Sequence, residues 1–163
     1  RHDIPANEMN CKEFIDRFTD TILDKKMWHC NISEKQRYLT ISKSILTQFD
    51  EINEVTEELY YYVQSLAAFA FDVEYATELA VRLYEFQKKN TGDRSFKTGR
   101  AAFKTGWIYS NGKQTQESLR TALDWYTLSD EIFSNVKLTN TDEISRHTLN
   151  KNDIAEVCCV KGC

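Results

Sequence analysis

The chain has 163 residues, of which 41% are hydrophobic and 28% are charged. This composition is typical of a soluble globular domain and excludes disordered and collagen-like chains. One proline and five glycines are too few for the turns of a β-sandwich or barrel, so the sequence favours long helices. The longest apolar run, 66–71, is far shorter than the roughly 20 residues of a membrane-spanning helix, so we expect no membrane partner.

Two helices are predicted in the N-terminal third. Apolar residues recur at three- and four-residue spacing after Asn7, which we expect to be the N-cap of the first helix. Ser33 and Gln36 have the spacing of a capping box, which predicts a second helix ending near Asp50. The two form a predicted hairpin over 1–54. Its buried stripe is expected to comprise Met9, Cys11, Phe14, Ile15, Phe18, Ile22, Leu23, Tyr38, Leu39, Ile41, Ile45, Leu46 and Phe49.

A second hairpin is predicted over 55–92. The segment 55–71 is rich in aromatics and alanine and becomes apolar all round, as in a helix buried between neighbours. Asp72 is the expected cap of the next helix. That helix is predicted to end at Gly92, because glycine readily adopts the left-handed conformation that ends helices.

The same plan recurs over 93–134. One helix is predicted from Ser95 to Tyr109, and a second from Thr115 to about Phe133. Between them, Ser110, Asn111 and Gly112 break the pattern. The more polar segment 135–163 is expected to connect to the start of a further helix.

The unit 93–134 has small and aromatic residues at the positions where two helices must approach closely. These are Thr105-Gly106 and Tyr109 in the first helix, and Ala122, Tyr126 and Ser129 in the second. The pattern resembles the tetratricopeptide repeat (TPR). The resemblance implies an all-α fold in which antiparallel helical hairpins stack as a right-handed α-α superhelix.

The unit 55–92 is a degenerate match to the same repeat. Its second helix opens with Asp72 to Ala76 in a TPR-like way, but Gln64 and Ala67 stand where glycine and tyrosine are usual. Neither unit has the closing proline of a TPR. The dipeptide Lys161-Gly162 repeats the pattern of Thr105-Gly106, so we expect a third, truncated repeat at the C-terminus.

The segment from Ile4-Pro5 to Phe14 resembles the junction that precedes TPR arrays in bacterial NB-ARC (STAND-type) regulators. This resemblance implies an arm of a cytoplasmic regulatory protein whose nucleotide-binding domain lies outside this chain. The chain has no start methionine and no signal-peptide pattern, so we expect a piece of a longer intracellular protein. A truncated repeat exposes an apolar flank, which predicts self-association through 154–163.

No catalytic or metal-binding motif is recognisable. The segment 92–98 lacks the second glycine of a phosphate loop, the three histidines are isolated, and there is no GxSxG sequence. The five cysteines are an odd set without a CxxC pair, which predicts reduced thiols. Cys158, Cys159 and Cys163 with His147 lack the spacing of a zinc site, and small buried side chains are the alternative. We therefore expect no enzyme activity, no metal and no cofactor.

Charge is unevenly distributed along this acidic chain of net charge -4. Residues 88–113 contain seven lysines and arginines against the single Asp93, whereas 50–58 contains five carboxylates. The basic segment suits an acidic partner, or nucleic acid with an affinity that falls steeply with salt. The overall acidic charge disfavours nucleic acid, and a solvated helix face is the alternative reading.

In TPR arrays the first helix of each hairpin lines the concave surface. The resemblance therefore implies a binding surface for a protein or peptide, with Trp107 and Arg100 as its principal residues because aromatics and arginine dominate binding hot spots. The alternative for Trp107 is packing against a neighbouring hairpin. A sensor arm that controls an attached nucleotide-binding domain is the alternative function. The candidate residues are Tyr61, Ser65, Ala68, Arg100, Phe103, Trp107, Ser110 and Asn111.

Overall fold

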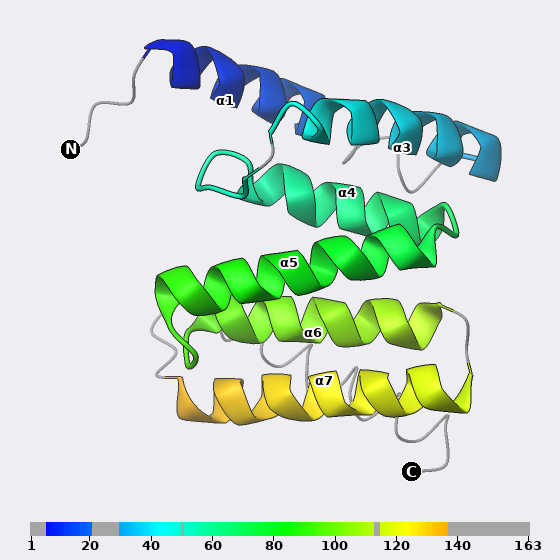
Figure 1. Cartoon of the computed structure of the whole chain (residues 1–163), viewed down its shortest axis with the longest axis vertical. Helices are drawn as coiled ribbons and strands as arrows, with labels where there is room; N and C mark the ends of the chain where they lie inside the picture. The colour runs from blue at the N-terminus through cyan, green and yellow to red at the C-terminus, as the bar shows by residue number, and fades with distance from the viewer. Residues whose placement is uncertain (1–5, 21–29, 50, 113–114, 137–163) are drawn as a thin grey trace. The chain divides into compact units, whose positions relative to one another are not determined.

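The computed structural model describes residues 6–20, 30–49, 51–112 and 115–136. In this part of the chain the regular elements are helices, and there is no strand (Figure 1). The all-α class predicted from the sequence is therefore confirmed for the described residues. The helices are α1 (Ala6–Phe18), α3 (Ile32–Leu46), α4 (Glu57–Phe69), α5 (Val73–Thr91), α6 (Phe96–Asn111) and α7 (Gln116–Asn135).

The chain divides within α5 into two compact units, 1–79 and 80–163. The N-unit (1–79) contains α1, α3, α4 and the first turns of α5. The C-unit (80–163) contains the rest of α5, α6 and α7.

The predicted N-caps of α1 and α3 are both wrong. Helix α1 begins at Ala6, so Asn7 lies within its first turn. The capping box of α3 is made by Asn31 and Glu34, not by Ser33 and Gln36: the Asn31 side chain accepts from the Glu34 N–H at 3.0 Å, and the Glu34 carboxylate accepts from the Asn31 N–H at 3.1 Å. Asparagine is as strong an N-cap as serine, and a carboxylate suits the positive end of a helix, so the helix begins earlier.

The buried stripe of α1 and α3 is narrower than predicted. Ile15, Phe18, Leu39 and Leu46 are buried as expected. Phe14 is 52% exposed and Ile41 is 39% exposed, so their prediction as core residues is wrong. In α3 the polar Ser42 takes the central buried place between Leu39 and Leu46, because it is three residues from one and four from the other.

Helix α4 is buried along most of its length, as its apolar composition predicted. Its buried apolar side chains are Leu59, Tyr60, Tyr61, Val63, Leu66 and Ala67. The Tyr60 hydroxyl donates to the Phe49 carbonyl at 3.0 Å and so ties the start of α4 to the segment after α3. Gln64, at the expected glycine position, is only 1% exposed, and its amide makes no hydrogen bond to the groups that the structure describes.

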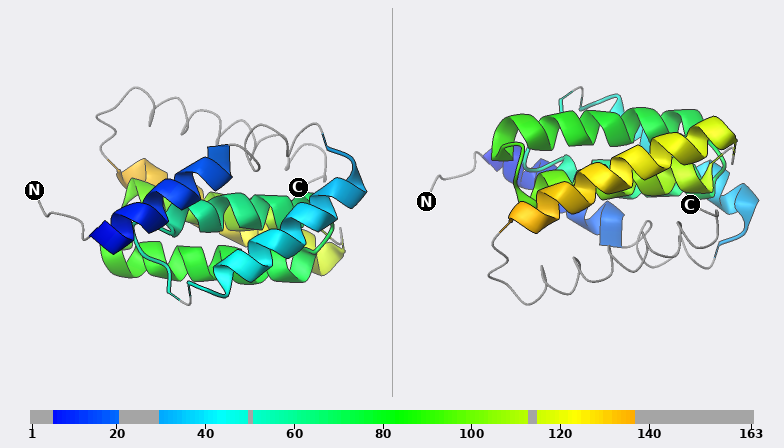
Figure 2. Two further views of the ribbon diagram at one scale, coloured as in Figure 1. Left: turned by 90° about the horizontal axis from the view of Figure 1, so that it is seen from above. Right: turned by 90° about the horizontal axis from the view of Figure 1, so that it is seen from below.

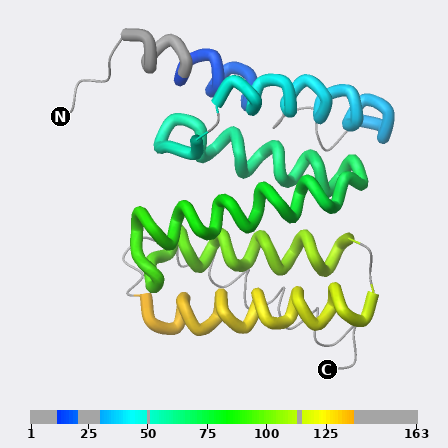
Figure 3. The backbone as a smooth tube through the Cα atoms, viewed as in Figure 1, coloured from blue at the N-terminus to red at the C-terminus, as the bar shows by residue number. Residues whose placement is uncertain are grey.

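Figure 3 traces the turn between α4 and α5, which is closed by a pair of backbone hydrogen bonds. The Asp72 N–H donates to the Ala67 carbonyl at 2.9 Å, and the Phe71 N–H donates to the Ala68 carbonyl at 3.2 Å. This is the Schellman pattern, and its left-handed position, where glycine is usual, is held by Phe71 with φ of 63°. The Asp72 side chain then accepts from the Tyr75 N–H at 3.3 Å, which confirms Asp72 as the cap of α5.

We expect Phe71→Gly to raise the free energy of unfolding by about 0.5–1 kcal/mol. The strain of a non-glycine residue in the left-handed region, about 1–2 kcal/mol, exceeds the extra unfolded-state entropy of glycine, about 0.5–1 kcal/mol. Urea denaturation at low protein concentration measures the change. Phe71→Ala is the control, because it removes the ring but keeps the strain. A glycine variant less stable than the alanine variant would contradict the strain argument.

The C-unit contains an antiparallel hairpin of α6 and α7, which cross obliquely in the right-hand view of Figure 2. The helix ends in this unit are set by local signals that the sequence predicted. Gly92 ends α5 with φ of 90°, and Ser95 caps α6 by accepting from the Thr98 N–H. Thr115 caps α7 by accepting from the Ser118 N–H. These three predicted helix ends are confirmed.

Two glycines let α6 and α7 approach closely. A Cβ atom on Gly99 would lie 2.8 Å from the Phe133 ring, and one on Gly106 would lie 3.1 Å from the Ala122 carbonyl oxygen. The Ser129 hydroxyl, fully buried, donates to the Gly99 carbonyl at 2.9 Å. The predicted close approach of Gly106 and Ala122 is therefore confirmed as a contact between these two helices.

We expect Gly106→Ala to lower the free energy of unfolding by about 1 kcal/mol. Overpacking against the α7 backbone costs about 1–3 kcal/mol, which outweighs the gain of about 1 kcal/mol in helix propensity. Thermal or urea unfolding measures the change. Thr127→Ala, on the exposed side of α7, is the control and should change stability by no more than about 0.5 kcal/mol. A stabilised Gly106→Ala would show that the helices separate at little cost.

Candidate functional site

One face of α6 combines aromatic and basic side chains. Arg100, Phe103, Lys104 and Trp107 have spacings of three and four residues, so they share this face, and all four are partly exposed. The opposite face is buried. Its residues are Thr98, Gly99, Ala101, Ala102, Thr105, Gly106 and Ile108. We call the partly exposed set Arg100, Phe103, Lys104 and Trp107 the α6 outer face.

The aromatic side chains of the α6 outer face are held by neighbours. The Phe103 and Tyr126 ring centroids lie 5.4 Å apart, so Phe103 is anchored on α7. The Lys104 ammonium lies 5.3 Å from the centroid of the Trp107 ring, a cation–π distance. Trp107 is thus neither a fully buried core residue nor an isolated surface residue.

The two predicted residues at the end of α6 have different environments. Ser110 is 6% exposed, and its hydroxyl lies 3.2 Å from the Tyr126 hydroxyl and donates to the Trp107 carbonyl at 2.9 Å. It therefore helps to join α6 and α7. Asn111 is exposed, and its amide donates to the same Trp107 carbonyl at 2.9 Å.

The three candidate residues in the N-unit lie on α4. Tyr61, Ser65 and Ala68 are four and three residues apart and so share one helix face. Tyr61 is 8% exposed, whereas Ser65 and Ala68 are partly exposed. The Ser65 hydroxyl donates to the Tyr61 carbonyl at 3.0 Å. This face therefore presents small side chains and little polar chemistry.

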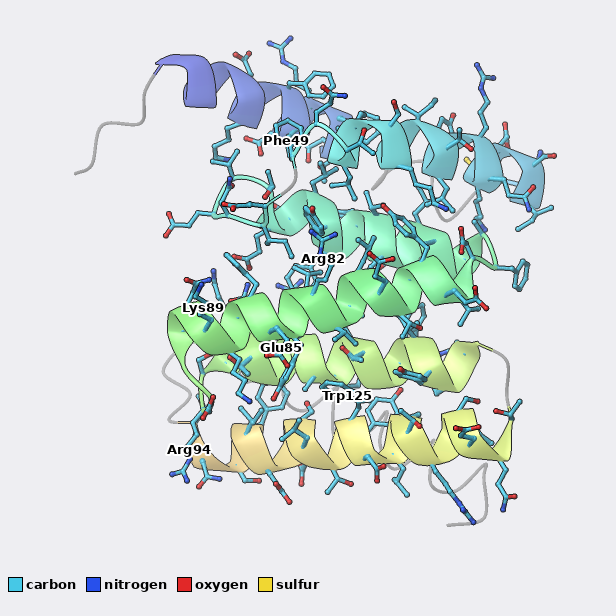
Figure 4. The ribbon with its side chains drawn as sticks, in the orientation of Figure 1. Phe49, Arg82, Glu85, Lys89, Arg94 and Trp125 are labelled. Carbon is cyan, nitrogen blue, oxygen red and sulfur yellow. The ribbon has the colours of Figure 1, made fainter. Side chains whose placement is uncertain are left out.

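The predicted basic segment is largely exposed where the structure describes it. Lys88 and Lys89 lie in the last turn of α5, Arg94 lies in the turn before α6 (Figure 4), and Lys97 lies in the first turn of α6. All four side chains are exposed. The first turn of α6 contains no acidic residue, so the positive end of that helix adds to the local positive potential.

Tyr84 connects α5 to the α6–α7 hairpin inside the C-unit. It is 7% exposed, packs with Ala101 and Ala102, and its ring lies edge-on to Trp125 at a centroid distance of 4.9 Å. Figure 4 shows Trp125 projecting from α7 toward α6. Burial raises the pKa of the Tyr84 phenol above its usual 10.0, and the nearby Lys88 acts in the opposite direction.

We expect this pKa shift to make stability fall at alkaline pH. The unfolded chain releases the phenol proton at about pH 10 while the folded protein still holds it, so the contribution is present below pH 10 and is lost as pH rises above it. Urea denaturation from about pH 8 to pH 11 should therefore show a steeper loss for wild type than for Tyr84→Phe. Both proteins contain the same other titrating groups, so the contributions of those groups cancel when the two pH profiles are subtracted. Equal slopes would contradict this role for Tyr84.

A cavity that the sequence did not predict lies in the N-unit between α3 and the α4–α5 turn. It has a volume of about 340 Å³. Its lining residues are Gln36, Leu39, Thr40, Lys43, Ala70, Phe71 and Asp72. In the sequence, this place is marked by Phe71-Asp72 at a predicted helix end. An aromatic residue stands there where glycine is usual, but this pattern does not predict a cavity.

The cation on the cavity wall is already paired. The Lys43 ammonium lies 2.6 Å from the Asp72 carboxylate and 4.3 Å from the centroid of the Tyr75 ring. The cavity therefore has no uncompensated charge among these residues. Phe71 at its edge is 78% exposed.

Within the described residues, no group of three or more His, Cys, Asp or Glu side chains could hold a metal ion. Cys30 is free and partly buried. The predicted C-terminal features, namely His147, Cys158, Cys159, Cys163, Lys161-Gly162 and the self-associating segment 154–163, lie outside the described residues.

None of the helices that the structure describes has the length and apolarity needed to cross a membrane. Comparison with models of protein families, with curated proteins and with solved structures found no match.

Proposed function

We propose that the chain is a TPR-like, peptide-binding module of a larger regulatory protein, and that the α6 outer face is its principal binding surface. The observation that carries the proposal is the division of α6 into two faces. One is packed closely on α7 through Gly99 and Gly106, and the other presents Arg100, Phe103, Lys104 and Trp107. A fixed helix with partly exposed aromatics loses little conformational entropy when a partner binds.

The chemistry of this face favours an acidic peptide with apolar side chains. Trp107 and Phe103 offer apolar surface, and Arg100 and Lys104 offer positive charge on the same face. Tryptophan and arginine are the residue types most enriched in binding hot spots. Complementary charge fixes the register of a bound peptide and accelerates its association.

Nucleic acid is a second candidate partner, which the exposed Lys88, Lys89, Arg94 and Lys97 favour. Each of these cations is exposed, but the chain as a whole has a net charge of -4. A long polyanion also lies against the acidic remainder of the surface, which repels it. A short peptide can bind the α6 outer face alone. The acidic peptide is therefore the better match.

Trp107→Ala is expected to weaken peptide binding about 10- to 30-fold, the effect of truncating a hot-spot residue. The probes are peptides selected from a random display library on the wild-type chain, and their affinities are measured by fluorescence anisotropy. We expect the selected peptides to be enriched in Asp and Glu and to contain an apolar anchor. Phe14→Ala is the matched control, because it removes another partly exposed aromatic ring, in the N-unit.

A charge-reversal pair separates the two basic regions. Arg100→Glu should weaken binding of the same peptides, whereas Arg94→Glu, in the turn before α6, should affect it much less. Equal effects would move the site to the basic turn. Displacement of the peptides by an equal concentration of a mixed-sequence DNA oligonucleotide would favour nucleic acid. Unchanged binding by Trp107→Ala would overturn the proposal.

A further inference from the structure

The chain that follows α7 starts beside the first turn of α6. The centroid of the Phe133 ring, near the end of α7, lies 5.3 Å from that of the Phe96 ring at the start of α6. Helix α7 ends at Asn135, and Val136 follows it in an extended conformation. Because α6 and α7 are antiparallel, a segment that returns after α7 runs in the same direction as α6.

The sequence 153–160 has the chemistry that the α6 outer face favours. It combines two carboxylates with apolar residues and contains no lysine or arginine. The carboxylates of Asp153 and Glu156 come first, and the apolar Val157 and Val160 follow. These four residues have spacings that place them on one side of a helical segment.

The second acidic pair after α7, at 142–143, is a poorer match. Only one apolar residue, Ile144, follows it before Arg146 and His147. A cation this close to the carboxylates repels the basic side chains of α6. The segment 153–160 is therefore the better complement in this part of the sequence.

Charge and apolar surface occur in the matching order along α6. Lys97 and Arg100 come first, and Trp107 lies near the end of the helix. Arg100 and Trp107 have the same separation in sequence as Asp153 and Val160. Helix α6 itself contains no Asp or Glu, so it supplies no carboxylate to its own cations.

We infer that residues 153–160 dock on the α6 outer face of their own chain and compete there with peptide partners, a regulation that rests on the proposed function of this face. The segment runs parallel to α6. Its carboxylates lie beside Arg100 and Lys104, and its valines lie on the Trp107 ring. Complementary charge fixes this register.

The connecting chain is long enough for docking within one molecule. From Val136 to Asp153 an extended chain spans about 55 Å, whereas α6 from Lys97 to Trp107 is about 15 Å long. Such a tether gives an effective concentration on the order of 1 mM. A segment with a dissociation constant on the order of 0.1 mM then weakens a competing peptide about tenfold.

The double variant Asp153→Lys, Glu156→Lys tests this competition in the whole chain. We expect it to bind the library-selected peptides about tenfold more tightly than wild type, because the competing segment no longer docks. Fluorescence anisotropy under reducing conditions measures both affinities. Asp142→Lys, Glu143→Lys is the matched control, since it makes the same change in net charge, and its affinity should stay within about twofold of wild type. Equal gains in both variants would assign the effect to net charge and overturn the inference.

Hydrogen exchange measures the docking without a peptide. We expect the amides of 153–160 to exchange about tenfold more slowly in the wild-type chain than in a synthetic peptide of the same sequence. Trp107→Ala should remove most of that protection. Exchange as fast as in the synthetic peptide, or protection that Trp107→Ala leaves unchanged, would contradict docking on α6. Protection that disappears on dilution would place the segment on a second copy instead.

These measurements distinguish failure of the docking from failure of the proposed function. Selected peptides that lose affinity with Trp107→Ala, but bind the Asp153→Lys, Glu156→Lys variant and wild type equally, support peptide binding and overturn the docking. Peptides that Trp107→Ala does not affect, together with faster exchange of 153–160 in that variant, support the docking and overturn peptide binding.

Discussion

The close approach of α6 to α7 at Gly99 and Gly106 is the constraint on which the described part of the C-unit depends. The two glycines are seven residues apart, so they lie on the same side of α6 and keep α7 near it over two turns. The Ser129 hydroxyl can reach the Gly99 carbonyl only because the backbones are this close. Dense packing of this kind leaves one helix orientation, and that orientation decides which side chains of α6 remain outside.

The candidate binding surface follows from this constraint. Once the small residues of α6 face α7, the longer side chains at Arg100, Phe103, Lys104 and Trp107 must lie on the other side. Phe103 reaches the edge of α7 and contacts Tyr126, whereas Trp107 is covered by Lys104 of its own helix. A partner that displaces Lys104 from the Trp107 ring gains an aromatic face without reorganising the backbone.

Local signals made most helix ends predictable from the sequence. Asp72, Gly92, Ser95 and Thr115 act through their own hydrogen bonds or φ angle, so no knowledge of tertiary contacts was needed. Asn31 and Ser33 are both good caps, and periodicity alone did not decide between them. The exposure of Phe14 and Ile41 could not be predicted either, because an apolar residue at the margin of a stripe becomes buried only if a neighbour covers it. Of the α6 outer face, Arg100, Phe103 and Trp107 were proposed from the resemblance to TPR hairpins, whereas Lys104 was not. The cavity needed the fold.

The α6 outer face and the cavity in the N-unit differ in the state of their positive charges. On α6, Arg100 and Lys104 are partly exposed beside the aromatics, so charge adds to the attraction of an acidic chain. At the cavity, Lys43 is neutralised by Asp72 and lies on the Tyr75 ring, so an acidic side chain gains little there and must break an existing pair.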